Sequence, residues 1–337
     1  MNQQYKQLRQ QLTRYYKIEK SGGWPEISGV QKVYKQGDSA AAVRQLKERL
    51  RQSGDYIDSD TSILFTTSLK DALQAAQQRF GLKPDGVAGP ATLRALNKPV
   101  TDRIKQMLVN MERMRWMPAS GEGKRLVANI PEYKLHVYEG AKKVFDMRIV
   151  VGKAANKTVV FNDQMKHIVF SPYWNIPASI VRNEILPAMQ RNSGYLSQKN
   201  MEQTGTRNGL PVIRQKPGGS NSLGRVKFLF PNSYAIYFHY TPARSLFGRN
   251  KRAFSHGCIR LAEPQKLAVY LLQDQQAWDE SRISSAMNAG TEKWVNLTEP
   301  VPVAITYFTS WADNDGQVHF REDIYGHDKA LAERLFN

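Results

Sequence analysis

The spacing of apolar residues changes once along this chain of 337 residues, and that change constrains the fold more than any other feature. Up to about Gly123, apolar side chains recur at every third or fourth position, which is the period of amphipathic helices. Beyond Gly123 they alternate with polar side chains, as in VFDMRIVVG, and alternation is typical of half-buried strands. A chain of this length commonly holds two or three domains. We therefore expect a multidomain α+β protein with a helical part followed by a mainly β part.

The helical part contains a compact unit from about Val33 to Asn97, which we expect to be a small three-helix bundle. Its first helix is expected to start with Asp38 or Ser39 as the N-cap. The second helix ends at Gly81 and the third has Pro90 near its first position, as helices commonly do. The residues expected to face inward are Val43, Leu46 and Leu50, then Leu69, Ala72, Leu73, Ala76 and Phe80, then Leu93 and Leu96.

Two further helical segments flank this bundle. Residues 1–32 begin with a polar amphipathic stretch and continue into a loop rich in glycine and proline. Residues 98–123 contain a connecting helix from Thr101 to Trp116, with Ile104, Leu108 and Met111 on its apolar stripe.

Residues 124–337 are expected to form the β part, a sandwich or barrel of short strands separated by Gly, Pro and Asn turns. The stretches KLHVYEG, RVKFLFPN and YAIYFHY are predicted to be further strands. Over about residues 178–210 the alternation stops, and polar, helix-like sequence predicts an inserted capping subdomain, which in compact domains is often a lid. One helix is predicted over Glu263–Leu272, with Leu267, Tyr270 and Leu271 turned inward.

Composition excludes several classes of protein. A single cysteine, Cys258, cannot form an intramolecular disulfide or a multi-cysteine zinc site, and no apolar run approaches the ~18–20 residues of a spanning helix. The net charge of +18 points to a polyanionic partner such as nucleic acid, an anionic membrane or a cell-wall polymer. The basic residues are scattered and no nucleic-acid-binding signature is present, so we expect no nucleic acid partner.

The stretch RAFSHGCIRL contains that cysteine, two residues after His256. A thiol attacks as the thiolate and needs a base or a cation nearby, because its ordinary pKa is about 8.5. His239 ends a predicted strand 19 residues before Cys258, and the two side chains can meet if the intervening loop returns beside that strand. Gly257 would let the backbone turn tightly, so that the amides of Gly257 and Cys258 could face a developing oxyanion. The alternative is a buried, inert cysteine.

The helical bundle closely resembles the three-helix type of peptidoglycan-binding domain. The resemblance rests on VRQLKERLRQSG and, residue by residue, on the turn GLKPDGVAGPATLRAL. It implies that residues 33–97 bind cell-wall glycan strands and stem peptides.

The stretch FHYTPARSLFGRNKRAFSHGCIRL resembles the signature of the L,D-transpeptidase (YkuD-type) family, and FSPYWNIPASI, KPGGSNSLGRVKFLFPN and HFREDIYGHD extend the likeness to its YcbB-like branch. The resemblance implies a sandwich-like catalytic domain over residues 124–337. It also implies that Cys258 attacks the carbonyl of the L-centre of meso-diaminopimelate in a tetrapeptide stem and releases D-alanine. The amine of a second stem would then resolve the acyl-enzyme to give a 3→3 crosslink.

The same resemblance assigns roles to other residues. His239 would be the base, oriented by the main-chain carbonyl of Tyr240, while Ser255, His256 and Gly257 would shape the turn that presents the sulfur. The expected substrate-binding residues are Arg260, Tyr237, Trp174 and Asn221. For Arg260 a structural salt bridge is the alternative, and for Tyr237 and Trp174 it is a role in the core.

The resemblance further implies a periplasmic enzyme that needs no cofactor and no metal and is inhibited by carbapenem β-lactams. The first residues of this chain lack an apolar signal core. Two other functions stay open from the sequence: an L,D-carboxypeptidase that hydrolyses the same acyl-enzyme, and a non-catalytic wall-binding protein.

Overall fold

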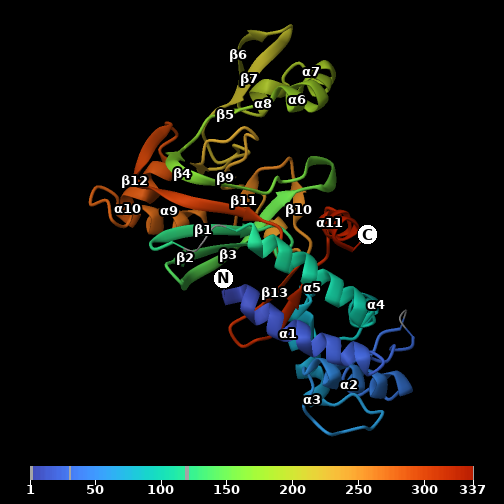
Figure 1. Ribbon diagram of the computed structural model, residues 1–337. Helices are drawn as coiled ribbons and strands as arrows, with labels where there is room; N and C mark the ends of the chain where they lie inside the picture. The colour runs from blue at the N-terminus through green and yellow to red at the C-terminus, as the bar shows by residue number, and fades with distance from the viewer. Residues whose placement is uncertain (1–2, 30–31, 118–120, 337) are drawn as a thin grey trace. The chain divides into compact units, whose positions relative to one another are not determined.

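The computed structural model describes residues 3–29, 32–117 and 121–336, which belong to two compact units. The helical unit comprises residues 1–120 and 307–337, and the β unit comprises residues 121–306. A mainly helical N-terminal region and a β-rich region confirm the predicted fold class (Figure 1). No helix among the described residues is long and apolar enough to cross a membrane.

The helical unit contains the three predicted helices of the bundle and three more. Its elements are α1 (Gln3–Lys20), α2 (Ala41–Ser53), α3 (Thr67–Arg79), α4 (Pro90–Leu96), α5 (Val100–Arg115), β13 (Ser310–Ala312), β14 (Val318–Phe320) and α11 (His327–Phe336). All the predicted inward-facing residues of α2, α3 and α4 are buried, and Gly81 has the left-handed φ of +67° expected just after a helix. The predicted N-cap of α2 is wrong. Ala40 occupies the cap position, because the carboxylate of Asp38 accepts a hydrogen bond from the Lys35 amide instead.

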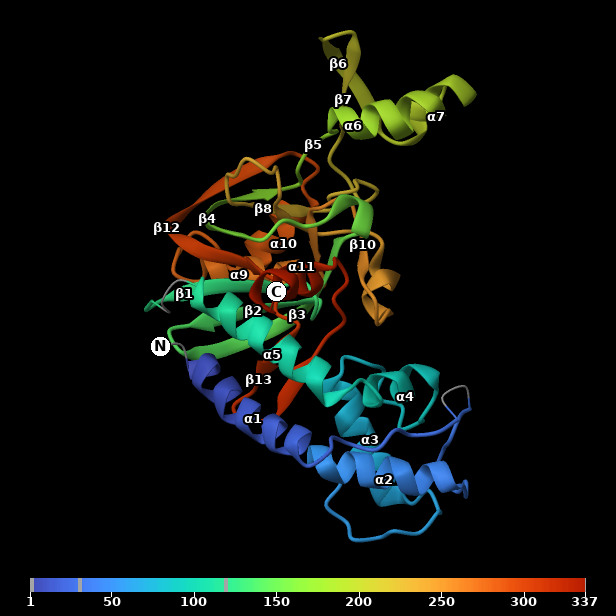
Figure 2. The same ribbon diagram turned by 45° about the vertical axis from the view of Figure 1, so that its right-hand side comes forward.

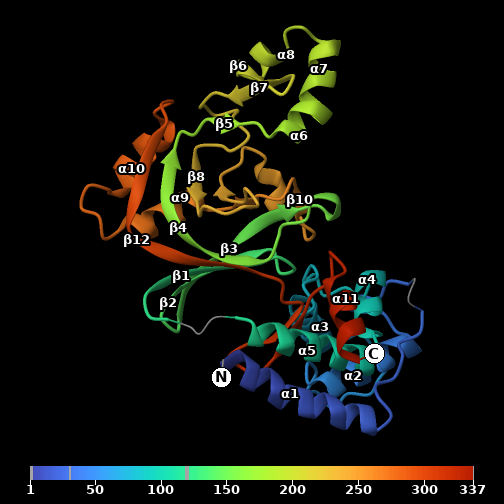
Figure 3. The same ribbon diagram turned by 45° about the horizontal axis from the view of Figure 1, so that its top comes forward.

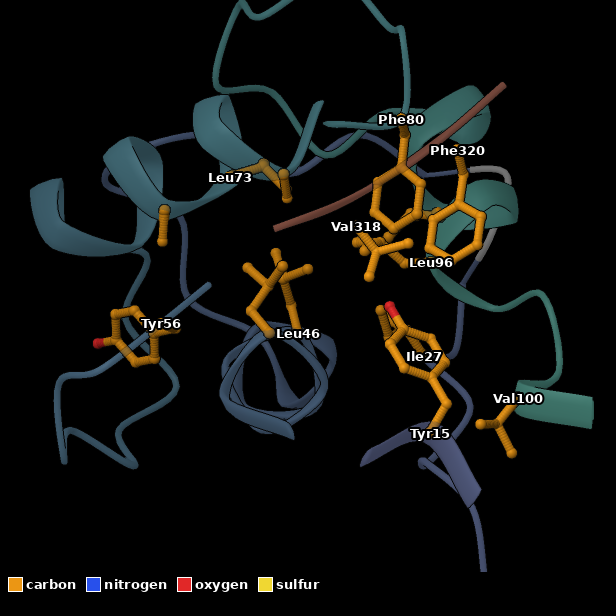
Figure 4. Packing of buried hydrophobic residues seen from close by; sticks show 14 of the residues in the cluster. Tyr15, Ile27, Leu46, Tyr56, Leu73, Phe80, Leu96, Val100, Val318 and Phe320 are labelled. Atoms are coloured by element: carbon orange, nitrogen blue, oxygen red, sulfur yellow. The ribbon is translucent and has the colours of Figure 1, made fainter. Parts of the chain in front are cut away.

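The C-terminal segment completes the core of the helical unit. Phe320 of β14 stacks on Phe80 with ring centroids 5.9 Å apart and also meets Tyr15 of α1 (Figure 4). Arg79 donates a hydrogen bond to the Val318 carbonyl (2.6 Å). The apolar end of α3 is therefore covered by residues 307–337, which the sequence analysis grouped with the β part. Helix α1 packs along α5, and α11 lies beside α5 (Figure 3).

The β unit is built on a nine-stranded sheet in the order β10-β3-β11-β9-β8-β4-β12-β1-β2, and an additional pairing of β3 with β2 closes the strands into a ring. The sequence left a sandwich or a barrel open, and this closure favours the barrel. The strands are β1 (Lys124–Asn129), β2 (Lys134–Glu139), β3 (Lys142–Gly152), β4 (Phe161–Phe170), β8 (Val226–Leu229), β9 (Phe238–His239), β10 (Ala253–Ser255), β11 (Ile259–Leu261) and β12 (Lys293–Thr306).

Two helices of the β unit pack against each other. They are α9 (Pro264–Leu272) and α10 (Glu280–Asn288), and two short 3-10 turns lie at Ala154–Asn156 and Arg244–Gly248. Helix α9 confirms the predicted helix after the cysteine, and Leu267, Tyr270 and Leu271 are buried as expected.

The capping insertion has a small core of its own, formed by Ile176, Val181, Ile185 and Ile213. It consists of β5 (Trp174–Asn175), α6 (Ala178–Ile180), a π-helical turn (Val181–Ile185), α7 (Leu186–Arg191), α8 (Tyr195–Gln198), β6 (Met201–Arg207) and β7 (Leu210–Gln215), gathered at one end of the β unit (Figure 2). The expectation of helix-like structure throughout residues 178–210 is wrong for residues 201–207, because β6 pairs with β7.

The predicted strand YAIYFHY is much shorter than expected, since only Phe238 and His239 pair with neighbouring strands. Before them the backbone turns: Ala235 has a φ of +53°, outside the range of a strand. The side chain of Asn232 holds this turn through hydrogen bonds to nearby main-chain groups.

Candidate active site

The loop after His239 returns beside its own strand, as the sequence predicted. Strand β11 pairs in parallel with β9, with Arg260 opposite His239 and Ile259 opposite Phe238. Because side chains alternate between the two faces of a strand, Cys258 lies on the face of Arg260, and Tyr237 on the face of His239. The pairing brings these four residues to one face of two adjacent strands.

The turn that carries Cys258 is fixed by hydroxyl groups. Ser255 is buried, and its Oγ donates to the Cys258 carbonyl (2.6 Å) and accepts from the Gly257 amide (3.2 Å). Thr158 Oγ1 donates to the Gly257 carbonyl (2.7 Å). Gly257 has a φ of +120°, which disfavours any residue with a Cβ.

Only one of the two expected oxyanion donors is free in this turn. The Gly257 amide is already bonded to Ser255, whereas the Cys258 amide has no acceptor within the described residues. The expectation that both amides face an oxyanion therefore does not hold for Gly257 in this structure.

His239 is buried, and its Nδ1 hydrogen-bonds to the Tyr240 carbonyl (2.5 Å). Since a carbonyl oxygen only accepts, the proton of the neutral ring is on Nδ1 and the lone pair is on Nε2. The position of Tyr240 depends on Gly224, where an added Cβ would lie 1.8 Å from the Tyr240 ring. The expected orienting role of the Tyr240 carbonyl thus matches the hydrogen bond observed.

Burial keeps both titratable groups neutral. Desolvation and then the positive charge of Arg260 lower the pKa of His239 to about 3, against backbone hydrogen bonds at Tyr240 and Leu223 that raise it. Desolvation raises the pKa of the Cys258 thiol, although hydrogen bonds from Tyr237 and the charge of Arg260 oppose this. The resting site therefore holds a thiol and a neutral imidazole, and the thiol must lose its proton when it attacks.

The side chain of Arg260 has no hydrogen bond or ion pair within the described residues, and its Nε is buried without a partner. The alternative of a structural salt bridge therefore has no partner in this structure. A buried polar group normally has a partner, so an unpartnered guanidinium beside Cys258 is suited to bind an anionic group of a ligand.

Two aromatic residues connect the site to the capping insertion. Burial raises the Tyr237 pKa well above its ordinary value, the neighbouring Cys258 raises it further, and Trp174 opposes the rise. Trp174 packs at the same time against the core of the insertion.

His256 and Asn221 lie in different surroundings. His256 is partly exposed, and its Nε2 pairs with Glu184 Oε1 of the insertion (2.9 Å). Asn221 is fully buried, and its amide donates to the Pro172 and Lys216 carbonyls and accepts from the Leu223 amide. The expectation that Asn221 lines a substrate cleft is not supported by this position, since its side chain is inaccessible and holds a loop together.

Comparison with known proteins shows where the chain belongs. Residues 123–302, more than half of the chain, match the L,D-transpeptidase catalytic domain family (YkuD), and residues 39–96 match the family described as "Putative peptidoglycan binding domain". The chain belongs to the L,D-transpeptidase family.

A curated relative from Haemophilus influenzae is named "Putative L,D-transpeptidase". It is 29% identical to this chain over 242 residues, which are 67% of the chain and 49% of the relative, so the chain spans about half the length of the curated relative it matches. Among solved structures, an L,D-transpeptidase from Stackebrandtia nassauensis has 14% identity and a TM-score of 0.33, covering 81% of this chain and 94% of that one. L,D-transpeptidase 3 from Mycobacterium tuberculosis with a faropenem-derived adduct has 14% identity and a TM-score of 0.28, covering 55% and 61%.

Several residues around the site of this L,D-transpeptidase family member were not predicted from the sequence: Thr158, Glu184, Asn232 and Ala235. Thr158, Glu184 and Ala235 contact the Ser-His-Gly-Cys motif only through folding. Asn232 holds the turn that contains Ala235. No spacing rule could have found them. The Asn-Ser pair in FPNSYA did signal a turn, since asparagine favours turns.

Proposed function

We propose that this chain is a peptidoglycan L,D-transpeptidase with Cys258 as nucleophile and His239 as general base. The observation that carries the proposal is the parallel pairing of β9 with β11, which puts both residues on one face, together with the Tyr240 carbonyl that leaves His239 Nε2 as the proton acceptor. The substrate class follows from the family and from the matched peptidoglycan-binding domain.

In the first half of the reaction, the sulfur of Cys258 forms a bond to the carbonyl carbon at the L-centre of the stem's diaminopimelate, and the thiol proton passes to His239. The Cys258 amide donates to the oxyanion that develops. The bond to the terminal D-alanine then breaks, and its nitrogen takes the proton from His239. A thioester on Cys258 remains.

In the second half, the side-chain amine of another stem attacks this thioester. His239 removes a proton from the amine, and the thiolate leaves and regains a proton as the new amide forms. The product is a 3→3 crosslink. The positive charge of Arg260 opposes protonation of His239, so a carboxylate bound to Arg260 would raise the basicity of His239 when substrate is present.

The two matched regions have different roles in this proposal. Residues 33–97 hold the wall polymer, and residues 124–306, which include the insertion, perform the reaction. Tyr237 and, from the insertion, Trp174 line the site. We place the enzyme in the periplasm, where this polymer lies, and its net charge of +18 favours approach to an anionic wall.

The proposal is tested by incubating the protein with tetrapeptide-containing muropeptides and identifying the products by mass spectrometry. Crosslinked dimers with released D-alanine are expected, and Cys258→Ala should yield neither. Tripeptides without dimers would assign hydrolysis, hence an L,D-carboxypeptidase. Unchanged turnover in Cys258→Ala would contradict the nucleophile.

A β-lactam gives a second test of the nucleophile. Solved family members are described in complex with imipenem and with a faropenem-derived adduct. We expect a carbapenem to add one covalent adduct to the intact mass of this protein, and Cys258→Ala to abolish it. If the adduct persists in that variant, another residue is acylated.

A further inference from the structure

Two residues of the segment from Asn232 to Tyr237 act on the sulfur of Cys258. They are Ala235 and Tyr237. The Ala235 carbonyl accepts a hydrogen bond from Cys258 Sγ (3.5 Å). The backbone and the side chain of Tyr237 lower the pKa of the Cys258 thiol, against the larger effect of desolvation. The acceptor of the thiol proton and the residue that favours the thiolate therefore lie on either side of Ile236.

The side chain of Asn232 clamps Ile236, the residue between these two. Its Oδ1 accepts from the amides of Tyr234 (3.0 Å) and Ile236 (3.2 Å). Its Nδ2 donates to the carbonyls of Phe230 (2.6 Å) and Ile236 (2.8 Å). Ile236 is thus held at both its amide and its carbonyl by one side chain.

Ala235 needs this support because its backbone is in the left-handed region, with a φ of +53°. That region is unfavourable for residues other than glycine and, to a lesser extent, asparagine and aspartate. Tyr237 has an anchor of its own, since its carbonyl accepts a hydrogen bond from the Ile259 amide (3.1 Å). Loss of the Asn232 side chain would therefore release the Ala235 carbonyl first.

We propose that Asn232 is a positioning residue for the nucleophile, holding the Ala235 carbonyl as the acceptor of the Cys258 proton in the resting enzyme. The acceptor fixes the direction of the S–H bond and keeps the sulfur neutral. During attack the proton moves from sulfur to His239, and the contact with Ala235 is lost. This role rests on the proposed function of Cys258, but the contacts themselves can be measured without turnover.

The single cysteine makes the first measurement direct, because the S–H stretching band in the infrared spectrum of the whole wild-type protein comes from Cys258 alone. We expect the band at the frequency of a hydrogen-bonded thiol, and its disappearance in Cys258→Ser will confirm the assignment. A band at the frequency of a free thiol would overturn the proposal. This result does not depend on any variant folding or on any activity.

The second measurement uses Asn232→Ala, with Asn192→Ala as the matched control. Asn192 also forms a local turn through its side chain, which accepts from the Gly194 amide (3.0 Å), but it lies in the capping insertion. In Asn232→Ala the thiol loses the acceptor that favours its neutral form, so its pKa should fall. The rate of alkylation by iodoacetamide at pH 7 should then rise roughly threefold for each half unit of that fall. Turnover should fall about tenfold or more, because the sulfur is no longer held in place.

Opposite changes in alkylation and turnover support the proposal, and Asn192→Ala should change neither. If turnover is lost while the pH profile of alkylation is unchanged, Asn232 is merely structural and the proposal is overturned. Wild-type behaviour of Asn232→Ala in both assays would also overturn the proposal. If the wild-type protein shows no transpeptidation at all, the proposed function fails, while the S–H band and the alkylation profile still decide the role of Asn232.

Discussion

Several arginines of the helical unit are buried, one arginine of the β unit, Arg260, is half-buried, and their surroundings differ. In the helical unit Arg49 donates to the Leu96 carbonyl and lies 3.7 Å from the Trp24 ring, and Arg79 pairs with Asp55. In the β unit Arg260 has no such partner within the described residues. Since a buried charge without a partner is costly, a fold retains one where it has a use. The buried helical arginines each have at least one hydrogen-bond partner, whereas the Arg260 side chain has none among the described residues, and we propose that it binds a ligand.

Arg103 strengthens this contrast. It donates to the Ala95 carbonyl (2.7 Å) and Gln106 (3.2 Å) and lies 4.4 Å from the Phe320 ring, and burial lowers its pKa to about 9. Burial also lowers the pKa of Arg49 to about 10. Ring faces and carbonyls replace water around these cations without neutralising them.

The largest effect is expected when a partnered arginine loses its carboxylate. In Asp55→Ala, Arg79 would stay buried without an anion, and the free energy of unfolding should fall by about 3–5 kcal/mol. Chemical denaturation followed by tryptophan fluorescence measures this. The control is Glu48→Gln, which removes the exposed pair with Arg51 and should cost less than about 0.5 kcal/mol. Equal losses of unfolding free energy in the two variants would contradict the larger contribution of the buried pair.

Removing the unpartnered arginine should affect catalysis instead of stability. Arg260→Gln removes a charge-assisted contact to the substrate, so kcat/KM should fall about ten- to a hundredfold. The unfolding free energy should stay the same or increase, because a desolvated charge is lost. Arg244→Gln, which removes an exposed arginine, is the control. A large loss of stability in Arg260→Gln would show that Arg260 is structural.

The buried His239 should make stability depend on pH. Its pKa is lowered to about 3 in the folded protein, against an ordinary value of about 6.5, so between these values the unfolded state binds more protons. Stability from this group is complete above about pH 6.5 and is lost as the pH falls toward 3, by at most about 1.4 kcal/mol per pH unit. Denaturation of wild type and His239→Gln between pH 7 and pH 4 measures the difference. Parallel pH profiles would contradict a neutral, buried His239.

The smallest effect is expected at the contact between His256 and Glu184. Both side chains are largely solvated, so the pair should contribute below about 1 kcal/mol. In Glu184→Gln we expect unchanged unfolding and a decrease in kcat/KM of about fivefold or less, measured with the muropeptide assay. A decrease above about a hundredfold would mean that this contact controls the position of the insertion.

The helical unit was largely predictable from the sequence, because its contacts are local. The periodic positions of α2, α3 and α4 are buried as predicted, and Gly81 and Pro90 lie where helix ends require them. What failed was the cap of α2, where Asp38 bonds to the Lys35 amide. A short polar side chain can accept a hydrogen bond from either of two nearby amides, and the local sequence does not determine which bond forms.

The candidate site was predictable only in part. The Ser-His-Gly-Cys motif and the histidine 19 residues earlier singled out Cys258 and His239, because both are chemically distinctive. Asn221 was placed in the cleft although it is buried, since its sequence neighbours do not reveal its depth. The turn at Ala235 was missed because alternation of apolar residues continued through it.

By itself, the sequence determined the order of the helical and β parts, the family signature and the residues that we propose as nucleophile and base. These depend on periodicity and on residue types that are close together in the chain. Only the tertiary structure decided that Arg260 is unpartnered, that residues 307–337 complete the helical core, and that Asn232 supports the turn beside Cys258. The helical core joins segments far apart in sequence, and the local turn of Asn232 lies beside Cys258 only because the whole chain packs in this way.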